Sequence, residues 1–214
     1  MLLYHYLNEQ YGIEALQNSC LKIGRLNNLN DPFEYYHIDI NNTSMRDIIR
    51  YRRKRANRNY GLICFSKNFS NPVQWAHYAD SHKGLCLGFE IPEDLVVKID
   101  YIQERTSASE FSKSLDLKEE SYLEYMLSRK YNHWSYEQEY RIIIKLSEKK
   151  NDHSFIFEKF SENINLKEII IGFRSMATKN QLKEILGKGT MVSIERVAPS
   201  VSKFEMVKIG NLQD

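Results

Sequence analysis

The sequence predicts an α+β fold, in which a single domain over residues 1–214 holds two mostly antiparallel sheets flanked by helices. Three observations predict it. Residues 2–7 (LLYHYL) alternate like a strand, residues 8–20 space their apolar side chains like a helix, and strand-like stretches dominate the C-terminal half. Such a mixture of elements is typical of the α+β class.

The first part of the chain is predicted to alternate strands and helices. Residues 27–36 are expected to form a loop, because Asn, Asp and Pro together favour turns. The next helix begins near Thr43 or Ser44, either of which can cap its N-terminus. The predicted order is a strand at 2–7, a helix at 8–20, a strand at 21–26, a helix at 43–57 and a strand at 61–66.

A short helix is predicted after these elements, because Asn71 can cap it and Pro72 suits the first helical position. We expect this helix to end near Ser81. Residues 108–131 are the longest helix candidate, with Tyr122 among the side chains that face the core. The remaining predicted elements are strands at 84–91, 95–102, 139–146, 154–160, 166–173, 191–197 and 203–209, with a helix at 178–186.

Composition and charge narrow the classes of protein to consider. Hydrophobic residues make up 42% and charged residues 27%, which is the range of globular proteins. No apolar run is long enough to cross a bilayer, and the N-terminal residues do not resemble a secretory signal. The three cysteines lack metal-ligand spacing, so we expect free thiols in a reducing cytoplasm. Because the net charge is only +2, any attraction to nucleic acid must come from a local patch.

The stretch HWSYEQEYRIIIK (133–145) places Glu137, Glu139 and Arg141 two residues apart. Strand side chains alternate, so these three are predicted on one face, at the entry of a strand that becomes apolar. Two close carboxylates repel and titrate as a coupled pair, and Arg141 can compensate one of them through a bidentate contact. A ladder of surface charges containing an ion pair is the alternative interpretation.

Aromatic and histidine side chains are concentrated in SNPVQWAHYADSHKG (70–84). On a helix, Trp75 and Tyr78 are i,i+3 neighbours, and Tyr78 and His82 are i,i+4 neighbours. A stripe of this kind is usually part of a core. The two histidines, His77 and His82, do not predict a metal site without a third ligand.

Two further candidates lie near the N-terminus. His5 stands on the first predicted strand, where a lone histidine is usually a hydrogen-bonded core or edge residue. Asn30 belongs to LNDPFE (29–34), a stretch that a turn is sufficient to explain.

A dense basic run follows in residues 46–58, with Asp47 as the opposing charge. On a helix these charges surround most of the circumference, so a solvated helix is one interpretation. The alternatives are phosphate contacts with nucleic acid or with a dinucleotide. The arginines that we assign to nucleic-acid contact are Arg50, Arg52, Arg53, Arg55 and Arg58.

Four motifs in order resemble a widespread bacterial family of unknown function, domain-of-unknown-function family 2971. The motifs are LNDPFE, CFS, WAHYADSHKGLCLGFE and W-x-Y-E-x-E-Y-R-I. The resemblance extends from LYHY to EIIIGF, which is nearly the whole chain. The family name implies no particular chemistry.

A more distant resemblance is to the ADP-ribosyltransferase superfamily. LLYHYLNEQYGIEALQNSCLKIGRL resembles the first strand, helix and short strand of its small toxin-like members, and YEQEYRIII resembles their late strand with a glutamate pair. The resemblance implies an ADP-ribosyltransferase-like fold with NAD as substrate. It implies that His5 holds the adenylate-side ribose and that Tyr78 or Trp75 packs on nicotinamide. It also implies that Glu139 is the catalytic glutamate and that Glu137 orients the substrate.

The chemistry of that superfamily suits these residue types. Breaking the nicotinamide–ribose bond passes through an oxocarbenium-like state, which a carboxylate stabilises. A second carboxylate can deprotonate an acceptor, and Arg141 can hold the pair in place or reach a phosphate. We also assign His77 and Asn30 to cofactor binding.

The leading hypothesis is a toxin-like enzyme that uses NAD, either transferring ADP-ribose to a macromolecule or hydrolysing NAD; a role in antiphage defence would fit it. One alternative is a metal-assisted enzyme that cleaves nucleic acid, in which carboxylates act with His77 or His82. The other is a non-enzymatic module whose 46–58 helix binds nucleic acid or a protein partner. A protein antitoxin is a further expected partner, and neither a resident metal nor a membrane is expected.

Overall fold

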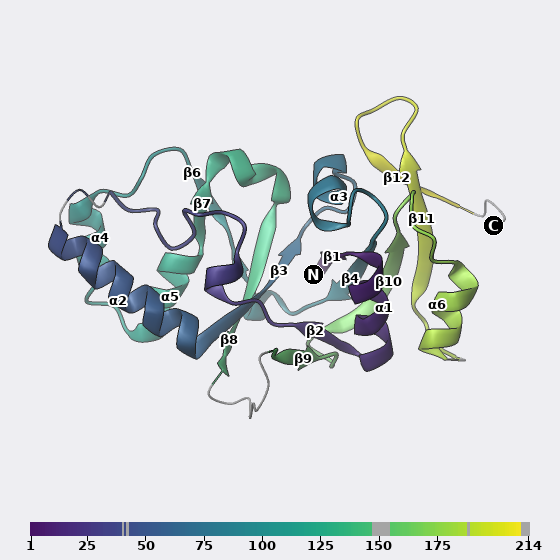
Figure 1. Ribbon diagram of the computed structural model, residues 1–214, viewed down its shortest axis with the longest axis horizontal. Helices are drawn as coiled ribbons and strands as arrows, with labels where there is room; N and C mark the ends of the chain where they lie inside the picture. The colour runs from purple at the N-terminus through teal and green to yellow at the C-terminus, as the bar shows by residue number, and fades with distance from the viewer. Residues whose placement is uncertain (40, 42, 147–154, 188, 211–214) are drawn as a thin grey trace.

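Figure 1 shows the computed structural model, which describes residues 1–39, 41, 43–146, 155–187 and 189–210. An eight-stranded sheet runs through the molecule in the order β12-β11-β10-β4-β1-β3-β8-β5. Its β10–β11 pair is parallel, and its other pairs are antiparallel. The strands are β1 (Leu2–Leu7), β3 (Tyr60–Ser66), β4 (Leu85–Glu90), β5 (Val97–Lys98), β8 (Glu139–Lys145), β10 (Asn165–Ile171), β11 (Ser193–Pro199) and β12 (Met206–Ile209).

The α+β class is confirmed, but the prediction of two main sheets is wrong. The N-terminal strand β1 has a partner on each side, β4 and β3, and it therefore joins two groups of strands into one sheet. The remaining strands form two small sheets: β2 (Cys20–Lys22) pairs with β9 (Phe157–Lys159), and β6 (Asp100–Ile102) pairs in parallel with β7 (Arg129–Tyr131).

The helices gather at the two ends of the sheet, as Figure 1 shows. Helices α2, α4 and α5 lie beside β3 and β8, whereas α1, α3 and α6 lie near β1, β4, β10 and β11. Their bounds are α1 (Glu9–Asn18), α2 (Thr43–Asn59), α3 (Pro72–Tyr78), α4 (Ala108–Ser114), α5 (Glu119–Leu127) and α6 (Lys179–Leu186), with 3₁₀ turns η1 (Leu26–Asn28), η2 (Glu93–Leu95) and η3 (Asn132–Glu137).

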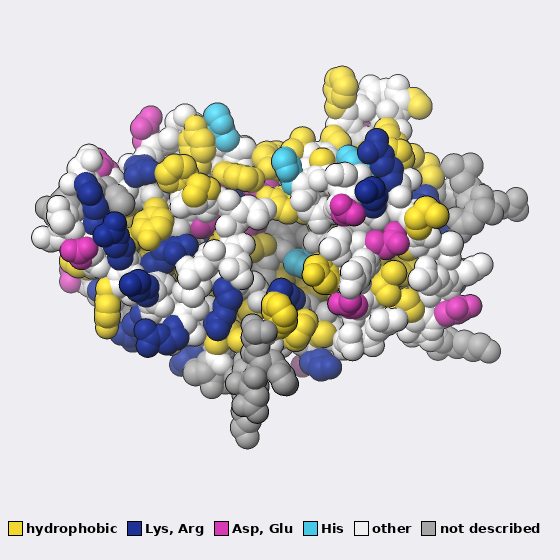
Figure 2. Space-filling view, in the orientation of Figure 1, with side chains coloured by type: hydrophobic (Ala, Val, Ile, Leu, Met, Phe, Trp, Pro, Cys, Tyr) yellow, Lys and Arg dark blue, Asp and Glu magenta, His cyan; other side chains and the backbone are white. Residues whose placement is uncertain are grey.

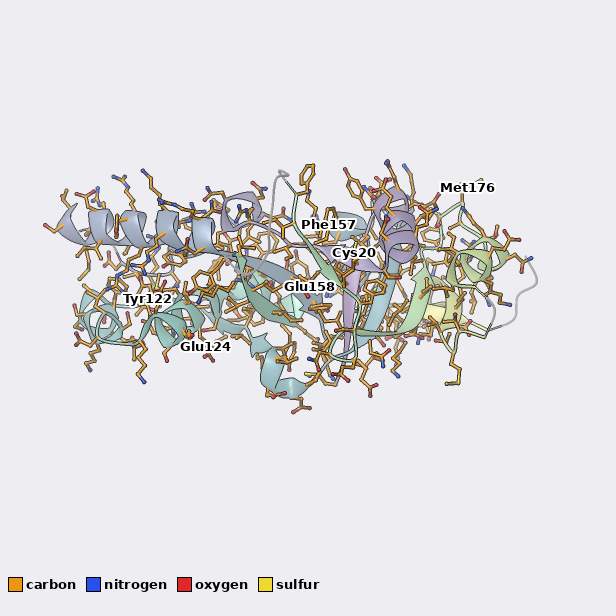
Figure 3. All side chains as sticks on the ribbon, turned by 90° about the horizontal axis from the view of Figure 1, so that it is seen from below. Cys20, Tyr122, Glu124, Phe157, Glu158 and Met176 are labelled. Carbon is orange, nitrogen blue, oxygen red and sulfur yellow. The ribbon has the colours of Figure 1, made fainter. Side chains whose placement is uncertain are left out.

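Each end of the molecule has its own apolar core. Under α1 and α6 the core contains Leu16, Phe89 and Leu182, all of them buried. Between α2 and α5 it contains Ile49 and Tyr122. Tyr122 is labelled in Figure 3, which shows α2 and α5 as two layers at this end of the molecule.

The predicted helix over 108–131 is wrong at its middle and at its end. It is divided into α4 and α5, and residues 129–131 form the strand β7. In α4 the hydroxyls of Ser112 and Ser114 bond back to the carbonyls of Ala108 and Phe111, an interaction that competes with a continuing helix. The consequence matters for function, because β7 carries Lys130 into the interior.

The helix in the aromatic stretch is confirmed, with the Asn71 side chain accepting a bond from the Val73 backbone N–H. It ends at Tyr78 because Asp80, Ser81 and His82 all have left-handed backbones, with φ of 44°, 54° and 71°. The predicted strand over 95–102 is divided between β5, which pairs with β8, and β6. No helix in the described part of the chain is long and apolar enough to span a bilayer.

Candidate functional site

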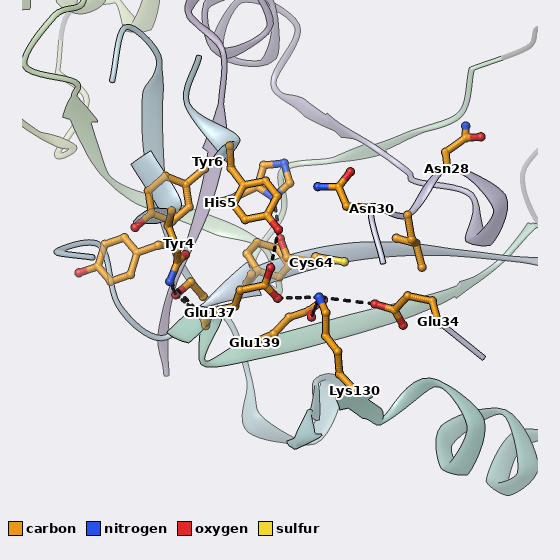
Figure 4. A pocket seen from close by; sticks show the side chains of 15 residues that line it. Tyr4, His5, Tyr6, Asn28, Asn30, Glu34, Cys64, Lys130, Glu137 and Glu139 are labelled. Atoms are coloured by element: carbon orange, nitrogen blue, oxygen red, sulfur yellow. Dashed lines mark hydrogen bonds and ion pairs between the residues drawn. The ribbon is translucent and has the colours of Figure 1, made fainter. Parts of the chain in front are cut away.

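A cavity of about 180 Å³ opens where β1 and β3 meet. Among the described residues, these strands pair at Tyr4 opposite Ser66, whereas β1 pairs with β4 along its whole length. Figure 4 shows the lining side chains, and Figure 2 shows this face hollowed near its middle. The lining is mostly aromatic, polar and charged, and it consists of Tyr4, His5, Tyr6, Asn28, Leu29, Asn30, Glu34, Cys64, Phe65, Ser66, Gln74, Tyr78, Lys130, Glu137 and Glu139.

One wall of the cavity is a buried ionic cluster centred on Lys130. Its Nζ lies 2.6 Å from Oε2 of Glu137, 3.0 Å from Oε2 of Glu139 and 3.5 Å from Oε1 of Glu34. Figure 4 shows this ammonium between the carboxylates. Burial alone would lower the pKa of Lys130, but Glu139, Glu34 and Glu137 together raise it above its usual value. Lys130 therefore remains charged.

Arg141 lies behind this wall and is 0% exposed. Its guanidinium donates to both oxygens of Glu139, at 2.6 and 2.9 Å, and to both oxygens of Glu34, at 2.9 and 2.6 Å. A fifth bond, of 3.0 Å, goes to the carbonyl of Leu127. Arg141 does not line the cavity, so it positions the two glutamates and does not itself face a ligand.

The two glutamates of the motif have different protonation behaviour. Burial raises the pKa of Glu139, but Arg141 and Lys130 outweigh burial and lower it to about 2. Burial also raises the pKa of Glu137, and here it outweighs the attraction of Lys130. Three carboxylates face two cations in this cluster, and the excess negative charge falls on Glu137. Glu139 is therefore a fixed anion, while Glu137 is the group that can take a proton.

Glu137 does not belong to the strand, contrary to the prediction that all three motif residues share a strand face. It ends the turn η3, and Gln138 has a left-handed backbone with φ of 46°, so β8 begins only at Glu139. This turn is held by Ser66, whose hydroxyl donates to the carbonyl of Glu137 at 2.6 Å. Gln74 donates to the carbonyl of Tyr136 at 2.9 Å. The Tyr78 hydroxyl then donates to Oε1 of Glu137.

His5 crosses the gap between β1 and β3. Its Nδ1 lies 2.7 Å from the carbonyl oxygen of Cys64 and must donate there. Burial lowers the pKa of His5, so the ring is neutral and Nε2 carries no proton. His5 therefore offers the cavity a hydrogen-bond acceptor.

The structure brings together five of the predicted site residues. His5, Asn30, Tyr78, Glu137 and Glu139 come from separate segments and line one cavity.

Two other assignments need correction. Trp75 is fully buried, donates its ring N–H to the carbonyl of Phe69 at 2.6 Å and packs on Tyr6, so it is a core residue and not a cavity wall. His77 lies exposed on α3 and does not line the cavity.

Sequence reasoning missed Lys130, the most central cation of the site. It was assigned to a helix, and only the pairing of β6 with β7 reveals its direction. Glu34 was interpreted as part of a turn, which it is, but the turn also delivers its carboxylate to Arg141. Lys130 is the middle residue of the short strand β7, and three residues are too few to give a periodic signal, so no pattern in the sequence could have found it.

The arginines of α2 have two kinds of environment. Arg52 lies 4.3 Å from the ring centroid of Tyr122, Arg53 donates to Asn27 at 2.7 Å, and Arg55 pairs with Glu119 at 2.8 Å. Arg52 and Arg53 therefore contribute to packing, whereas Arg55 is itself exposed and its ion pair lies at the surface. Of the five arginines assigned to nucleic-acid contact, Arg50 and Arg58 are also exposed, and Arg50 has a loose contact with Asp47 at 3.7 Å.

The donor set does not favour a metal in the described part of the chain. No three His, Cys, Asp or Glu side chains form a metal-binding group there. The carboxylates of Glu34, Glu137 and Glu139 do converge, but the ammonium of Lys130 lies between them. A divalent cation would have to displace that ammonium.

Fold and site thus define an α+β protein with a small polar cavity backed by a buried ionic cluster. A family model described as a protein of unknown function (DUF2971) matches residues 74–142. This segment contains most of α3, all of β4 and the Glu137–Arg141 motif, and over these residues the chain is similar to that family; the match covers about a third of the chain and not the nearly whole length that the motifs predicted. Neither the curated proteins nor the solved structures gave a match.

Proposed function

We propose that this protein is an enzyme that uses NAD, either transferring ADP-ribose or hydrolysing the nicotinamide–ribose bond. The observation that supports the proposal is the convergence of a fixed carboxylate, a protonatable carboxylate, an aromatic hydroxyl and a neutral imidazole around one cavity. These are the contributions of Glu139, Glu137, Tyr78 and His5.

The size of the cavity fits part of the substrate. Pockets for drug-sized ligands occupy about 300–1,000 Å³, whereas this one has about 180 Å³. It therefore accepts the nicotinamide–ribose end, and the rest of the dinucleotide lies outside it. Asn28 and Asn30, both exposed on the lining, are positioned to contact the part that emerges.

The roles follow from the two protonation states. When the C1–N bond of the ribose breaks, its electron pair goes to the nicotinamide nitrogen, which leaves as neutral nicotinamide. The ionised carboxylate of Glu139 stabilises the positive ring that results. Water or an acceptor hydroxyl then bonds to C1 and gives its proton to Glu137, whose raised pKa suits a general base. The Tyr78 hydroxyl holds Glu137 toward the cavity.

The test uses chromatography to measure the nicotinamide that the protein releases from NAD. We expect release by the wild-type protein and its loss in both Glu139→Gln and Glu137→Gln. Glu162→Gln, which replaces an exposed glutamate, is the matched control and should retain full activity. Circular dichroism checks that each variant is folded. The proposal is refuted if millimolar NAD neither binds to the wild-type protein nor yields nicotinamide.

A further inference from the structure

Helix α2 concentrates positive charge that the use of NAD does not explain. It carries seven cationic side chains against the one carboxylate of Asp47, whereas the net charge of the whole chain is only +2. The rest of the chain is therefore net negative, and a polyanion is attracted to this end of the molecule. Figure 2 shows the Lys and Arg side chains gathered along α2, at the left of the view.

Three of these cations form a row on the outward face of the helix. Arg50, Lys54 and Arg58 follow one another at a spacing of four residues, and all three are exposed. The buried residues Ile49 and Ala56 lie on the opposite side of the helix and pack in the core. With a rise of about 1.5 Å per residue, the row extends over about 12 Å. A row of this length matches several anionic groups in succession better than a single phosphate.

The row costs the helix stability. Side chains at i and i+4 are neighbours on a helix, and like charges at this spacing destabilise it. Among the described residues, the carboxylates close to α2 pair with Arg50 and Arg55 and leave Lys54 and Arg58 unpaired. A face that contacts only water is more stable with acidic residues between the basic ones. An arrangement that weakens its own helix therefore indicates a role in binding.

An open aromatic ring lies beside the row. Tyr51 is 68% exposed, and it precedes Lys54 by three residues and Arg58 by seven, so it shares their side of the helix. The next residue, Arg52, turns inward and packs on the ring of Tyr122. A cationic surface that follows a phosphate backbone, together with an aromatic ring on which a base stacks, is typical of sites for single-stranded nucleic acid.

Two other polyanionic partners fit this surface less well. A helix that lies on a lipid surface turns its apolar face outward, but Lys54 and Arg58 occupy the centre of the outward face of α2 and Ile49 faces the core. In a duplex the bases are already stacked on one another, so Tyr51 would gain no stacking partner.

We propose that the outward face of α2 binds a single strand of nucleic acid, with Arg50, Lys54 and Arg58 on successive phosphates and a base stacked on Tyr51. Lys54, which the sequence reasoning omitted, stands at the middle of the row. The proposal does not depend on NAD cleavage, because no residue of the cavity takes part.

Fluorescence anisotropy with labelled single-stranded RNA and DNA decamers tests the proposal at salt concentrations from about 50 to 200 mM. We expect binding that weakens as the salt concentration rises. The triple variant Arg50→Gln, Lys54→Gln, Arg58→Gln should reduce the log–log slope by about 2, because each phosphate contact with a single strand contributes about 0.7. Its replaced side chains are exposed, so the variant should fold like wild type, which circular dichroism checks.

A matched control removes the same charge elsewhere. Arg174, Lys183 and Lys203 are exposed and lie outside α2, and replacing all three by Gln should leave the affinity and the slope unchanged. An equal loss in both triple variants would overturn the proposal, because binding would then depend on net charge and not on this surface.

Tyr51→Ala separates stacking from charge. It should weaken decamer binding at least about fivefold, the lower end of the contribution of one stacked base, and leave the salt slope unchanged. Tyr51→Phe keeps the ring and should bind like wild type. A tighter RNA decamer identifies RNA as the strand and a tighter DNA decamer identifies DNA, whereas equal affinities indicate recognition through features that both share.

The remaining measurements keep this result distinct from the NAD proposal and from other partners. Glu139→Gln should bind the decamers like wild type, whether or not nicotinamide is released from NAD. The proposal is overturned if neither decamer binds at about 50 mM salt, or if Tyr51→Ala binds like wild type. It is also overturned if a duplex decamer or phosphatidylserine vesicles bind as tightly as the single strands.

Discussion

Removing the guanidinium of Arg141 tests whether the ionic cluster holds this part of the fold. Arg141→Met keeps a side chain of similar length but deletes five hydrogen bonds, four of them to Glu34 and Glu139. Both carboxylates stay buried. Lys130 is then the remaining cation of the cluster, at 3.5 and 3.0 Å from them.

The size of the effect follows from this geometry. Removing one partner of a buried ion pair costs about 3–5 kcal/mol, because an uncompensated charge remains in the interior. Since Lys130 still offers partial compensation, we expect a loss near the lower end, about 3 kcal/mol. That is a large fraction of the roughly 5–15 kcal/mol by which domains are stable.

Urea unfolding followed by far-UV circular dichroism at pH 7.5 measures the loss. Burial raises the pKa of Glu139, and Arg141 is the largest attraction that lowers it to about 2, so without Arg141 we expect this pKa to rise above its unfolded value. The folded variant then binds more protons than the unfolded chain, so acidification to pH 5 should shrink the deficit. Adding Glu139→Gln to the Arg141→Met variant should also recover part of the lost unfolding free energy. Lys145→Met, on the exposed end of the same strand, is the control. A loss below about 1 kcal/mol, or one that does not change with pH, would refute the reasoning.

Three further predictions concern other parts of the molecule. The folded-state pKa of His37 is about 3, below the unfolded value of 6.5, so lowering the pH through this window destabilises the protein. In His37→Phe the unfolding free energy should depend less steeply on pH between pH 6 and 4.5, by an amount approaching 1.4 kcal/mol per pH unit. An unchanged slope would contradict burial of the neutral His37 ring. Gly84→Ala should lower the urea-unfolding free energy by about 3 kcal/mol, because a Cβ there would lie 2.0 Å from a backbone oxygen of Leu7; Tm values equal to wild type would disprove it. If the exposed arginines of α2 contact phosphates, replacing Arg50 and Arg58 by Gln should reduce the salt dependence of nucleic-acid binding by about 1.5 in log–log slope, and an identical slope would exclude that contact.

Local patterns predicted the elements that depend on neighbours in the chain. The alternation in residues 2–7, the Asn71–Pro72 helix start and the apolar strand over 139–145 are all present in the structure. These features depend on backbone preferences and side-chain periodicity, which a short stretch already contains.

The candidate site could be predicted only in part, because it depends on distant contacts. Glu137 and Glu139 were found from their spacing, but the left-handed Gln138 between them redirects Glu137 toward Tyr78. The turn is held by Ser66, which lies 71 residues away in sequence. Lys130 was missed for the same reason, since its direction comes from a parallel pairing with residues 100–102 and not from its own neighbours.

The boundary between β1 and β3 in the large sheet has a consequence for the binding of a ligand. Five strands lie on one side of it and three on the other, and within the sheet the described residues of β1 and β3 pair at Tyr4 opposite Ser66, with the His5 side chain bonded to the Cys64 carbonyl. The apolar core continues across this boundary, because Leu3 and Phe89 of the larger block pack in one buried cluster with Ile63 and Phe65 of the smaller block. The cavity of the candidate site lies beside this core. A molecule bound in this cavity contacts both blocks at once, so its binding would stabilise the folded protein by adding contacts across their boundary.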